Sequence, residues 1–143
     1  SKNRSNDYIF DWDSMLSFEG NTSPYLQYAY TRIYSIFEKT SFGSEDIKGD
    51  LQISNNEERK LALVLLNFGE TLEQVAAQGY PHILCSYLFD LASSYMVFYE
   101  HCPILKRDIP PTIKMSRLIL SKNTSQILKK GLNLLGIEVM EKM

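Results

Sequence analysis

Hydrophobic residues recur at intervals of three and four along most of this chain, which is the spacing of amphipathic helices. The clearest run follows a break at Gly20-Asn21 and predicts a helix over about 24–39. Ser23 is the expected cap, and Pro24 suits the first helical position because its missing N–H costs nothing there. The stripe that would face a core consists of Leu26, Ala29, Ile33, Ile36 and Phe37.

The same spacing predicts helices for most of the remaining chain. They are expected at about 11–16, 55–69, 71–79, 81–101 and 111–135, with a loop over 40–54. Asn55 and the acidic residues after it are typical of a capped helix start, and Gly136 is placed to follow the last helix. Because no two strand-like segments occur together, we predict one domain with an all-α fold, a helical bundle of about five main helices.

A chain of 143 residues with 44% hydrophobic and 22% charged residues fits one globular domain with a substantial core. No apolar run approaches the roughly 18 residues that span a membrane, so no membrane partner is expected. The first residues show neither a secretory signal nor an initiating Met, which is expected of a fragment or a processed product.

The two cysteines, Cys85 and Cys102, are expected to be buried free thiols in a reducing compartment. His82 and His101 lie near them in the sequence, but zinc sites need closer ligand pairs and no CxxC is present. We therefore predict no metal site.

The net charge of −2 hides an asymmetry. Residues 105–143 carry eight Lys or Arg and three Asp or Glu, whereas residues 1–104 carry seven and fourteen. A basic end on an acidic body can place an anionic partner on one side. A solvated helix face is the commoner meaning of such a run, and both interpretations stay open.

Two aromatic edges are the best candidates for a binding site. At 100° per residue, Tyr25, Tyr28 and Arg32 share one edge of the first long helix. Tyr95 and Tyr99, four residues apart, share an edge of a later helix. Rings and a guanidinium can stack on bases and pair with phosphate. Spacing alone nevertheless favours the simpler interpretation, in which these side chains rim or fill the core.

No arrangement of residues specifies an active site. The sequence has no glycine-rich phosphate loop after a strand and no pattern that specifies a catalytic triad. Lys114-Met115-Ser116-Arg117 is similar to the start of the KMSKS signature of class I aminoacyl-tRNA synthetases. That signature needs a mobile loop and an upstream HIGH motif, whereas this tetrapeptide lies in a helical pattern without HIGH. We interpret it as a coincidence and predict no catalytic residue.

Four segments resemble the C-terminal part of bacterial arginyl–tRNA synthetase, including its α-helical DALR anticodon-binding domain. They lie at 8–22, 24–33, 87–103 and 128–143, and they begin YIFDWDSMLSFEGNT, PYLQYAYTRI, YLFDLA and LKKGLNLLGIE. Lys142 replaces the arginine of the family's E-R-M-like terminus. Together the segments cover nearly the whole chain, and the first two and the terminus are specific to the arginine enzyme.

The resemblance implies a class I ligase that activates arginine with ATP and Mg and esterifies it to its tRNA. A catalytic domain would precede this chain, so residues 1–20 would be a connector and residues 21–143 the anticodon-binding domain. The fragment would need no cofactor, would be inactive alone, and is expected to be a cytoplasmic monomer. Its partners would be the anticodon stem-loop of arginine tRNA and its own catalytic domain.

By the same resemblance, six side chains would face the anticodon: Tyr25, Tyr28, Arg32, Tyr95, Tyr99 and the terminal Met143. The motif PYLQYA-x-x-R carries the first three. Lysines of the last helix would contact phosphate without reading sequence. The alternative is a helical protein–protein interaction module without RNA binding. Salt separates the two, because RNA affinity falls steeply with ionic strength.

Overall fold

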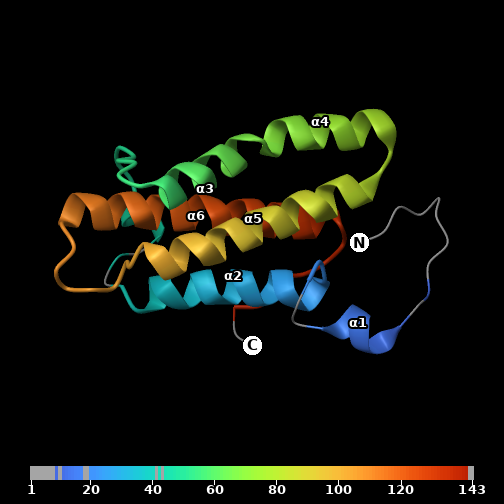
Figure 1. The fold of residues 1–143 in the computed structure, drawn as a ribbon, viewed down its shortest axis with the longest axis horizontal. Helices are drawn as coiled ribbons and strands as arrows, with labels where there is room; N and C mark the ends of the chain where they lie inside the picture. Colours follow the sequence, from blue (N-terminus) through green and yellow to red (C-terminus); the bar gives the residue numbers. More distant parts are fainter. Residues whose placement is uncertain (1–8, 10, 18–19, 41, 43, 142–143) are drawn as a thin grey trace.

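The computed structural model describes residues 9, 11–17, 20–40, 42 and 44–141. Over these ranges the chain forms helices and no strand. In order they are α1 (Trp12–Leu16), α2 (Ser23–Glu38), the 3-10 helix η1 (Ser44–Asp46), α3 (Asn56–Leu66), α4 (Phe68–Gln78), α5 (Pro81–His101) and α6 (Pro111–Leu134) (Figure 1). The long helices α2 to α6 confirm the predicted all-α bundle. None of the helices in this described part is long and apolar enough to cross a membrane.

The start of α2 lies one residue earlier than the sequence pattern predicts. Thr22 is the N-cap, and its hydroxyl accepts a hydrogen bond from the Tyr25 N–H at 3.3 Å. Ser23 is therefore the first helical residue rather than the cap, and Pro24 is the second. Threonine and serine cap helices in the same way, so the pattern could not separate two adjacent hydroxyl residues.

The break between α3 and α4 lies at Asn67 rather than near Gly69. Asn67 keeps right-handed torsions (φ −76°, ψ −3°), so it joins the two helices without a glycine, and Gly69 lies inside α4. Two other predicted ends are confirmed. Asn55 caps α3 in a capping box with Glu58, and Gly136 follows α6 with φ 75°.

The helix α5 is central to the bundle. It contacts α2, α3, α4 and α6, and in Figure 1 it lies between α2 and the α3–α4 pair. Side chains with no exposed surface come from four helices: Ile33 of α2, Leu61 of α3, Leu88 and Leu91 of α5, and Leu118 and Leu128 of α6. Burying each such side chain stabilises the fold by roughly 1.5–3 kcal/mol. This core fixes how α2 and α5 face each other, and the candidate site lies on those two helices.

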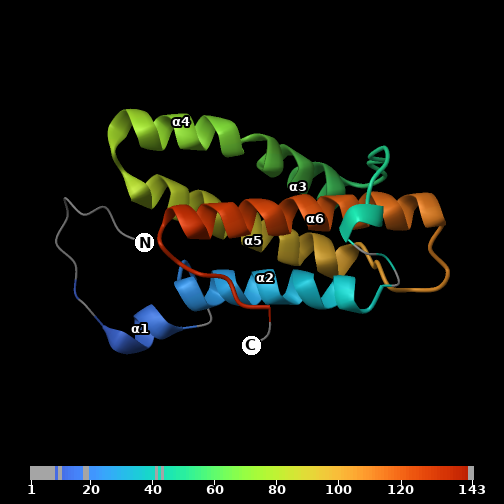
Figure 2. The same ribbon diagram turned by 180° about the vertical axis from the view of Figure 1, so that it is seen from behind.

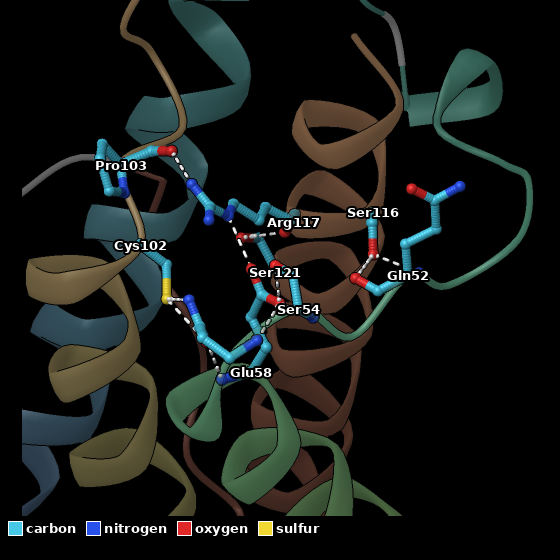
Figure 3. A network of polar contacts seen from close by, with 9 residues as sticks. Gln52, Ser54, Glu58, Cys102, Pro103, Ser116, Arg117 and Ser121 are labelled. Carbon is cyan, nitrogen blue, oxygen red and sulfur yellow. Dashed lines mark hydrogen bonds and ion pairs between the residues drawn. The ribbon is translucent and has the colours of Figure 1, made fainter. Parts of the chain in front are cut away.

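A buried ion pair joins α3 to α6 (Figure 3). Nε of Arg117 donates to Oε1 of Glu58 at 2.7 Å, and Nη1 donates to the Pro103 carbonyl at 2.6 Å. Oε2 of Glu58 accepts hydrogen bonds from the Ser54 N–H and hydroxyl at 2.7 and 2.9 Å. Burial acts to raise the pKa of Glu58, but the hydrogen bonds from Ser54 and Arg117 outweigh it and hold that pKa below its ordinary value.

The Lys114–Arg117 tetrapeptide lies inside α6, as its helical pattern predicts. The Ser116 hydroxyl accepts a hydrogen bond from the Gln52 N–H at 2.8 Å and lies 3.1 Å from the Gln52 carbonyl (Figure 3). The segment therefore fastens the loop before α3 to α6. Arg117 is one of the eight positive charges of residues 105–143, but it is buried against Glu58, so its charge is not offered to a partner.

Both cysteines are free thiols. Cys102 is buried, and its sulfur accepts a hydrogen bond from the Asn55 side-chain amide at 3.2 Å. Burial raises the pKa of the Cys102 thiol, which keeps it protonated. Cys85 is only half-buried, so the prediction of two buried thiols is confirmed for Cys102 and not for Cys85.

Candidate nucleic-acid interface

Tyr28 and Arg32 lie together on one edge of α2, as their spacing predicts, and their side chains are joined by a hydrogen bond. Tyr28 is 36% exposed, and its hydroxyl accepts a hydrogen bond from Nη1 of Arg32 at 2.6 Å. The spacing of four residues places the two side chains one helical turn apart. Ala29 and Ile33, which have no exposed surface, lie about 100° further around the helix and hold that side of this stretch in the core. The edge therefore offers a phenol ring and a positive charge together.

Arg32 also connects this edge to α5. Its guanidinium carbon lies 5.0 Å from the centre of the Tyr99 ring, within the range of a cation–π contact. Tyr99 is half-buried, so part of its ring remains accessible. The two aromatic edges predicted from the sequence therefore meet through one arginine. We call Tyr28, Arg32 and Tyr99 the aromatic–arginine surface.

Tyr25 lies on the same edge of α2 but is more engaged with α5. Its ring centre lies 5.5 Å from that of Phe89, and its hydroxyl lies 3.4 Å from the Ser93 hydroxyl. Both partners belong to α5, so Tyr25 helps to join the two helices while it remains partly exposed. Tyr25 thus packs at the rim of the core, as its spacing favoured, and still borders the accessible surface.

Tyr95 is not on the surface, which corrects the prediction that it faces a ligand. Its side chain is 0% exposed, and its hydroxyl donates to the Ser121 hydroxyl of α6 at 3.1 Å. Burial raises the pKa of Tyr95 far above its ordinary value, so the phenol stays neutral. Its ring stacks against Tyr99 at 6.4 Å between centres. Tyr95 therefore supports Tyr99 from inside the bundle.

The C-terminal segment crosses α2 on the face shown in Figure 2. Nε2 of Gln27 donates to the Glu138 carbonyl at 2.9 Å, and the Thr31 hydroxyl donates to the Met140 carbonyl at 3.1 Å. The sequence pattern predicts neither contact, because a neutral polar side chain on a partly exposed helix position carries no signal of its partner. Met143 lies outside the described residues, and its role stays a prediction.

Two lysines of α6 face another side of α2. A groove of about 410 Å³ lies between the helices, lined by Tyr34 and Phe37 among the α2 residues and by Lys122 and Lys129 from α6. Tyr34 follows Arg32 by two residues, which is about 200° around a helix. The groove and the aromatic–arginine surface therefore occupy different sides of α2.

Comparisons with known proteins identify the family and the fold. Residues 26–143 match the family described as the DALR anticodon binding domain. The arginine–tRNA ligases of Mannheimia succiniciproducens and Saccharophagus degradans are 56% and 54% identical to this chain, over 100% and 99% of its length. Among solved structures, the arginyl-tRNA synthetase of Plasmodium falciparum matches 99% of the chain with a TM-score of 0.89 and 35% identity. That of Thermus thermophilus matches 90% with a TM-score of 0.79 and 39% identity.

The chain spans only about a quarter of these relatives. It covers 25% and 24% of the two ligases, and 25% and 22% of the two solved chains. The family match nevertheless includes most of α2, the whole of α5 and the C-terminal segment, which contain the candidate site. By this match the chain belongs to the DALR anticodon-binding domain family.

Proposed function

We propose that this chain is the C-terminal domain of an arginine–tRNA ligase and that it holds the anticodon arm of arginine tRNA. The two ligases that match over nearly all of its length, and the anticodon-binding family to which it belongs, support this assignment. Attachment of arginine, with its need for ATP and Mg, belongs to a catalytic domain that would lie in the rest of such a ligase. The chain itself contributes only tRNA binding, and it acts as a monomer in the cytoplasm.

One observation carries the proposal: Arg32 joins the exposed Tyr28 to Tyr99 on a neighbouring helix. Bases splayed from an RNA loop stack on aromatic side chains and are read at their Watson–Crick edges. Tyr28 and Tyr99 supply rings for stacking, and Arg32 supplies donors for phosphate or for a base edge. Each stacked base contributes about 1–3 kcal/mol. Tyr25 borders this surface, and Met143 is a further predicted contact.

The direct test is binding of this chain to the anticodon stem-loop of arginine tRNA and to the same RNA with its middle anticodon base changed. We expect tighter binding to the unchanged RNA, measured by fluorescence anisotropy. Equal affinity for the two RNAs would refute base reading. An affinity for either RNA that does not fall with added salt would refute contacts to phosphate, because such contacts release counterions. No measurable binding to either RNA would refute the proposed function.

A protein-interaction module is the second candidate, and the exposed apolar side chains of α1 favour it. Trp12 is 67% exposed and Leu16 is 59% exposed, which suits contact with another protein surface. The two functions are compatible, since a ligase's catalytic domain would be such a partner. A salt-insensitive complex that depends on Trp12 and excludes RNA would favour the interaction module instead.

A further inference from the structure

The chain leaves α6 through a turn that redirects it. Gly136 takes φ 75°, and its N–H bonds to the Asn133 carbonyl at 3.0 Å. The Ile137 N–H bonds to the Leu132 carbonyl at 2.9 Å. These two bonds form a Schellman cap, in which a glycine in the left-handed region ends the helix. The segment that follows runs from the end of α6 to the middle of α2 (Figure 2).

This segment, residues 137–141, lies on the bundle as an extended strap. Ile137 and Val139 pack against the core, whereas Glu138, Met140 and Glu141 are exposed. Such alternation is the periodicity of an extended chain with one buried side. The strap is therefore a packed part of the domain.

Two side chains of α2 hold the strap in register. Gln27 donates to the Glu138 carbonyl at 2.9 Å, and Thr31, one turn later, donates to the Met140 carbonyl at 3.1 Å. Residues four apart lie along one face of a helix, so the strap runs beside α2 in the same direction. Because both acceptors are main-chain carbonyls, the two bonds fix the position of the strap's backbone.

A third contact lies further along the same helix. The Glu141 carboxylate raises the pKa of the Tyr34 hydroxyl by its negative charge and by accepting a hydrogen bond from it. Tyr34 follows Thr31 by three residues, so it continues the same face of α2. The strap is thus held at successive turns of α2.

The face that holds the strap borders the aromatic–arginine surface. Gln27 directly precedes Tyr28, and Thr31 directly precedes Arg32, so each pair lies about 100° apart around the helix. The strap therefore stands on one side of Tyr28 and Arg32, and Tyr99 of α5 stands on the other. Met140, whose carbonyl bonds to Thr31, is 41% exposed and is therefore an accessible residue of the strap.

We propose that Gln27 and Thr31 are positioning residues for RNA binding. They hold residues 137–141 as one wall of the aromatic–arginine surface and act on the RNA through that wall. This inference rests on the proposed function and extends it to residues that are not expected to touch the RNA.

The test compares the double variant Gln27→Ala/Thr31→Val with the control Gln74→Ala/Thr112→Val. The control removes the same two residue types from exposed positions on α4 and α6. We expect amide hydrogen exchange of residues 137–141 to become about tenfold faster only in the first variant. Its affinity for the anticodon stem-loop should fall about three- to tenfold, whereas the control should bind as the unaltered chain does.

A shortened chain that ends at Gly136 separates positioning from direct contact. We expect it to bind RNA more weakly, and we expect Gln27→Ala/Thr31→Val to have no further effect in it. If the shortened chain does not fold, as judged by circular dichroism, Val139→Asp in the full chain serves the same purpose. That substitution places a charge on the packed side of the strap.

Two outcomes overturn the proposal. The first is an equal loss of affinity from Gln27→Ala/Thr31→Val with and without the strap, since the side chains would then contact RNA themselves. The second is an unchanged RNA affinity in Gln27→Ala/Thr31→Val although amide hydrogen exchange of residues 137–141 becomes faster. If the unaltered chain binds no RNA, the proposed function fails and this role fails with it. If the unaltered chain binds and only the variants are unaffected, this role alone fails.

Discussion

The guanidinium carbon of Arg32 lies 5.0 Å from the centre of the Tyr99 ring, and this contact joins α2 to α5 at the candidate binding surface. The same guanidinium donates a hydrogen bond to the Tyr28 hydroxyl at 2.6 Å. One planar cation therefore orients two rings. Lysine carries the same charge but lacks the planar fork of donors, so substitution can separate charge from geometry.

Two substitutions of Arg32 should weaken RNA binding to different extents. Arg32→Ala removes the charge and both ring contacts, and we expect a loss of about 1–3 kcal/mol. Arg32→Lys should recover only part of this loss, because an ammonium cannot bond Tyr28 and stack on Tyr99 at once. RNA affinity is measured over a series of salt concentrations. The control variant is Lys106→Ala, which also removes one positive charge but from an exposed position outside the candidate site. Full recovery by lysine would show that charge alone matters.

Tyr28 should contribute through its ring more than through its hydroxyl. Tyr28→Ala removes a stacking surface, and we expect RNA binding to weaken by about 1–3 kcal/mol. Tyr28→Phe keeps the ring and loses only the acceptor for Arg32, so its effect should be smaller. Thermal unfolding should change little, because the side chain is 36% exposed. If Tyr28→Ala unfolds the domain while its folded fraction keeps the RNA affinity, the residue is a packing residue.

Tyr95→Phe should affect stability and leave RNA binding unchanged. The substitution removes a buried hydroxyl that donates to Ser121 at 3.1 Å. Ser121 still donates to the Arg117 carbonyl at 2.9 Å, so only an acceptor position is left unfilled. We expect the free energy of unfolding to fall by about 1 kcal/mol, measured by urea denaturation. A loss of RNA affinity without a loss of stability would return Tyr95 to the binding surface.

Local features of the fold could be predicted from the sequence, because helix ends and faces depend on neighbouring residues. The pattern placed α5 at Pro81–His101 and the α3 cap at Asn55, where both occur. Contacts between distant residues could not be predicted in this way. Glu58 has a local role in the cap and Arg117 belongs to a basic segment, yet the two pair in the core from 59 positions apart.

The candidate site shows the same division between local and distant information. Helical geometry placed Tyr28 beside Arg32 on one edge, and the structure joins them. Tyr95 and Tyr99 also share an edge, but the packing of α6 over α5 decides which of them is buried. The burial of each tyrosine therefore depends on how α5 and α6 are arranged, and residue spacing within α5 alone cannot predict it.

Replacing either of two helical glycines by alanine should change the stability of the fold, in opposite directions at the two positions. A Cβ at Gly131 of α6 would lie 2.5 Å from Cδ2 of Leu88, which has no exposed surface into which it could move. Gly131→Ala should therefore destabilise the fold by about 1–3 kcal/mol through overpacking. A Cβ at Gly69 in α4 meets nothing within 4 Å, so Gly69→Ala should stabilise by up to about 1 kcal/mol. Thermal melting of both variants decides whether α5 and α6 touch this closely.

Glu58 should make the free energy of unfolding fall as the pH is lowered. Its pKa is lower in the folded chain than in the unfolded one, so its ionised form is favoured by folding. The stabilisation is complete above the unfolded pKa of about 4.3, and it is lost as the pH falls through the folded pKa. In Glu58→Gln this dependence is absent, and Arg117 keeps a buried charge without its partner. We expect a loss of about 3–5 kcal/mol at pH 7.

The measurement is urea denaturation of Glu58→Gln between pH 3 and pH 7. The exposed Glu73→Gln serves as the control, because it removes a carboxylate without a buried partner. The difference in unfolding free energy between the unaltered chain and Glu58→Gln should be largest near pH 7 and should shrink in acid. A constant difference would show that the carboxyl has the same pKa folded and unfolded. The contact of Glu58 with Arg117, which joins α3 to α6, would then not depend on ionisation of the carboxyl.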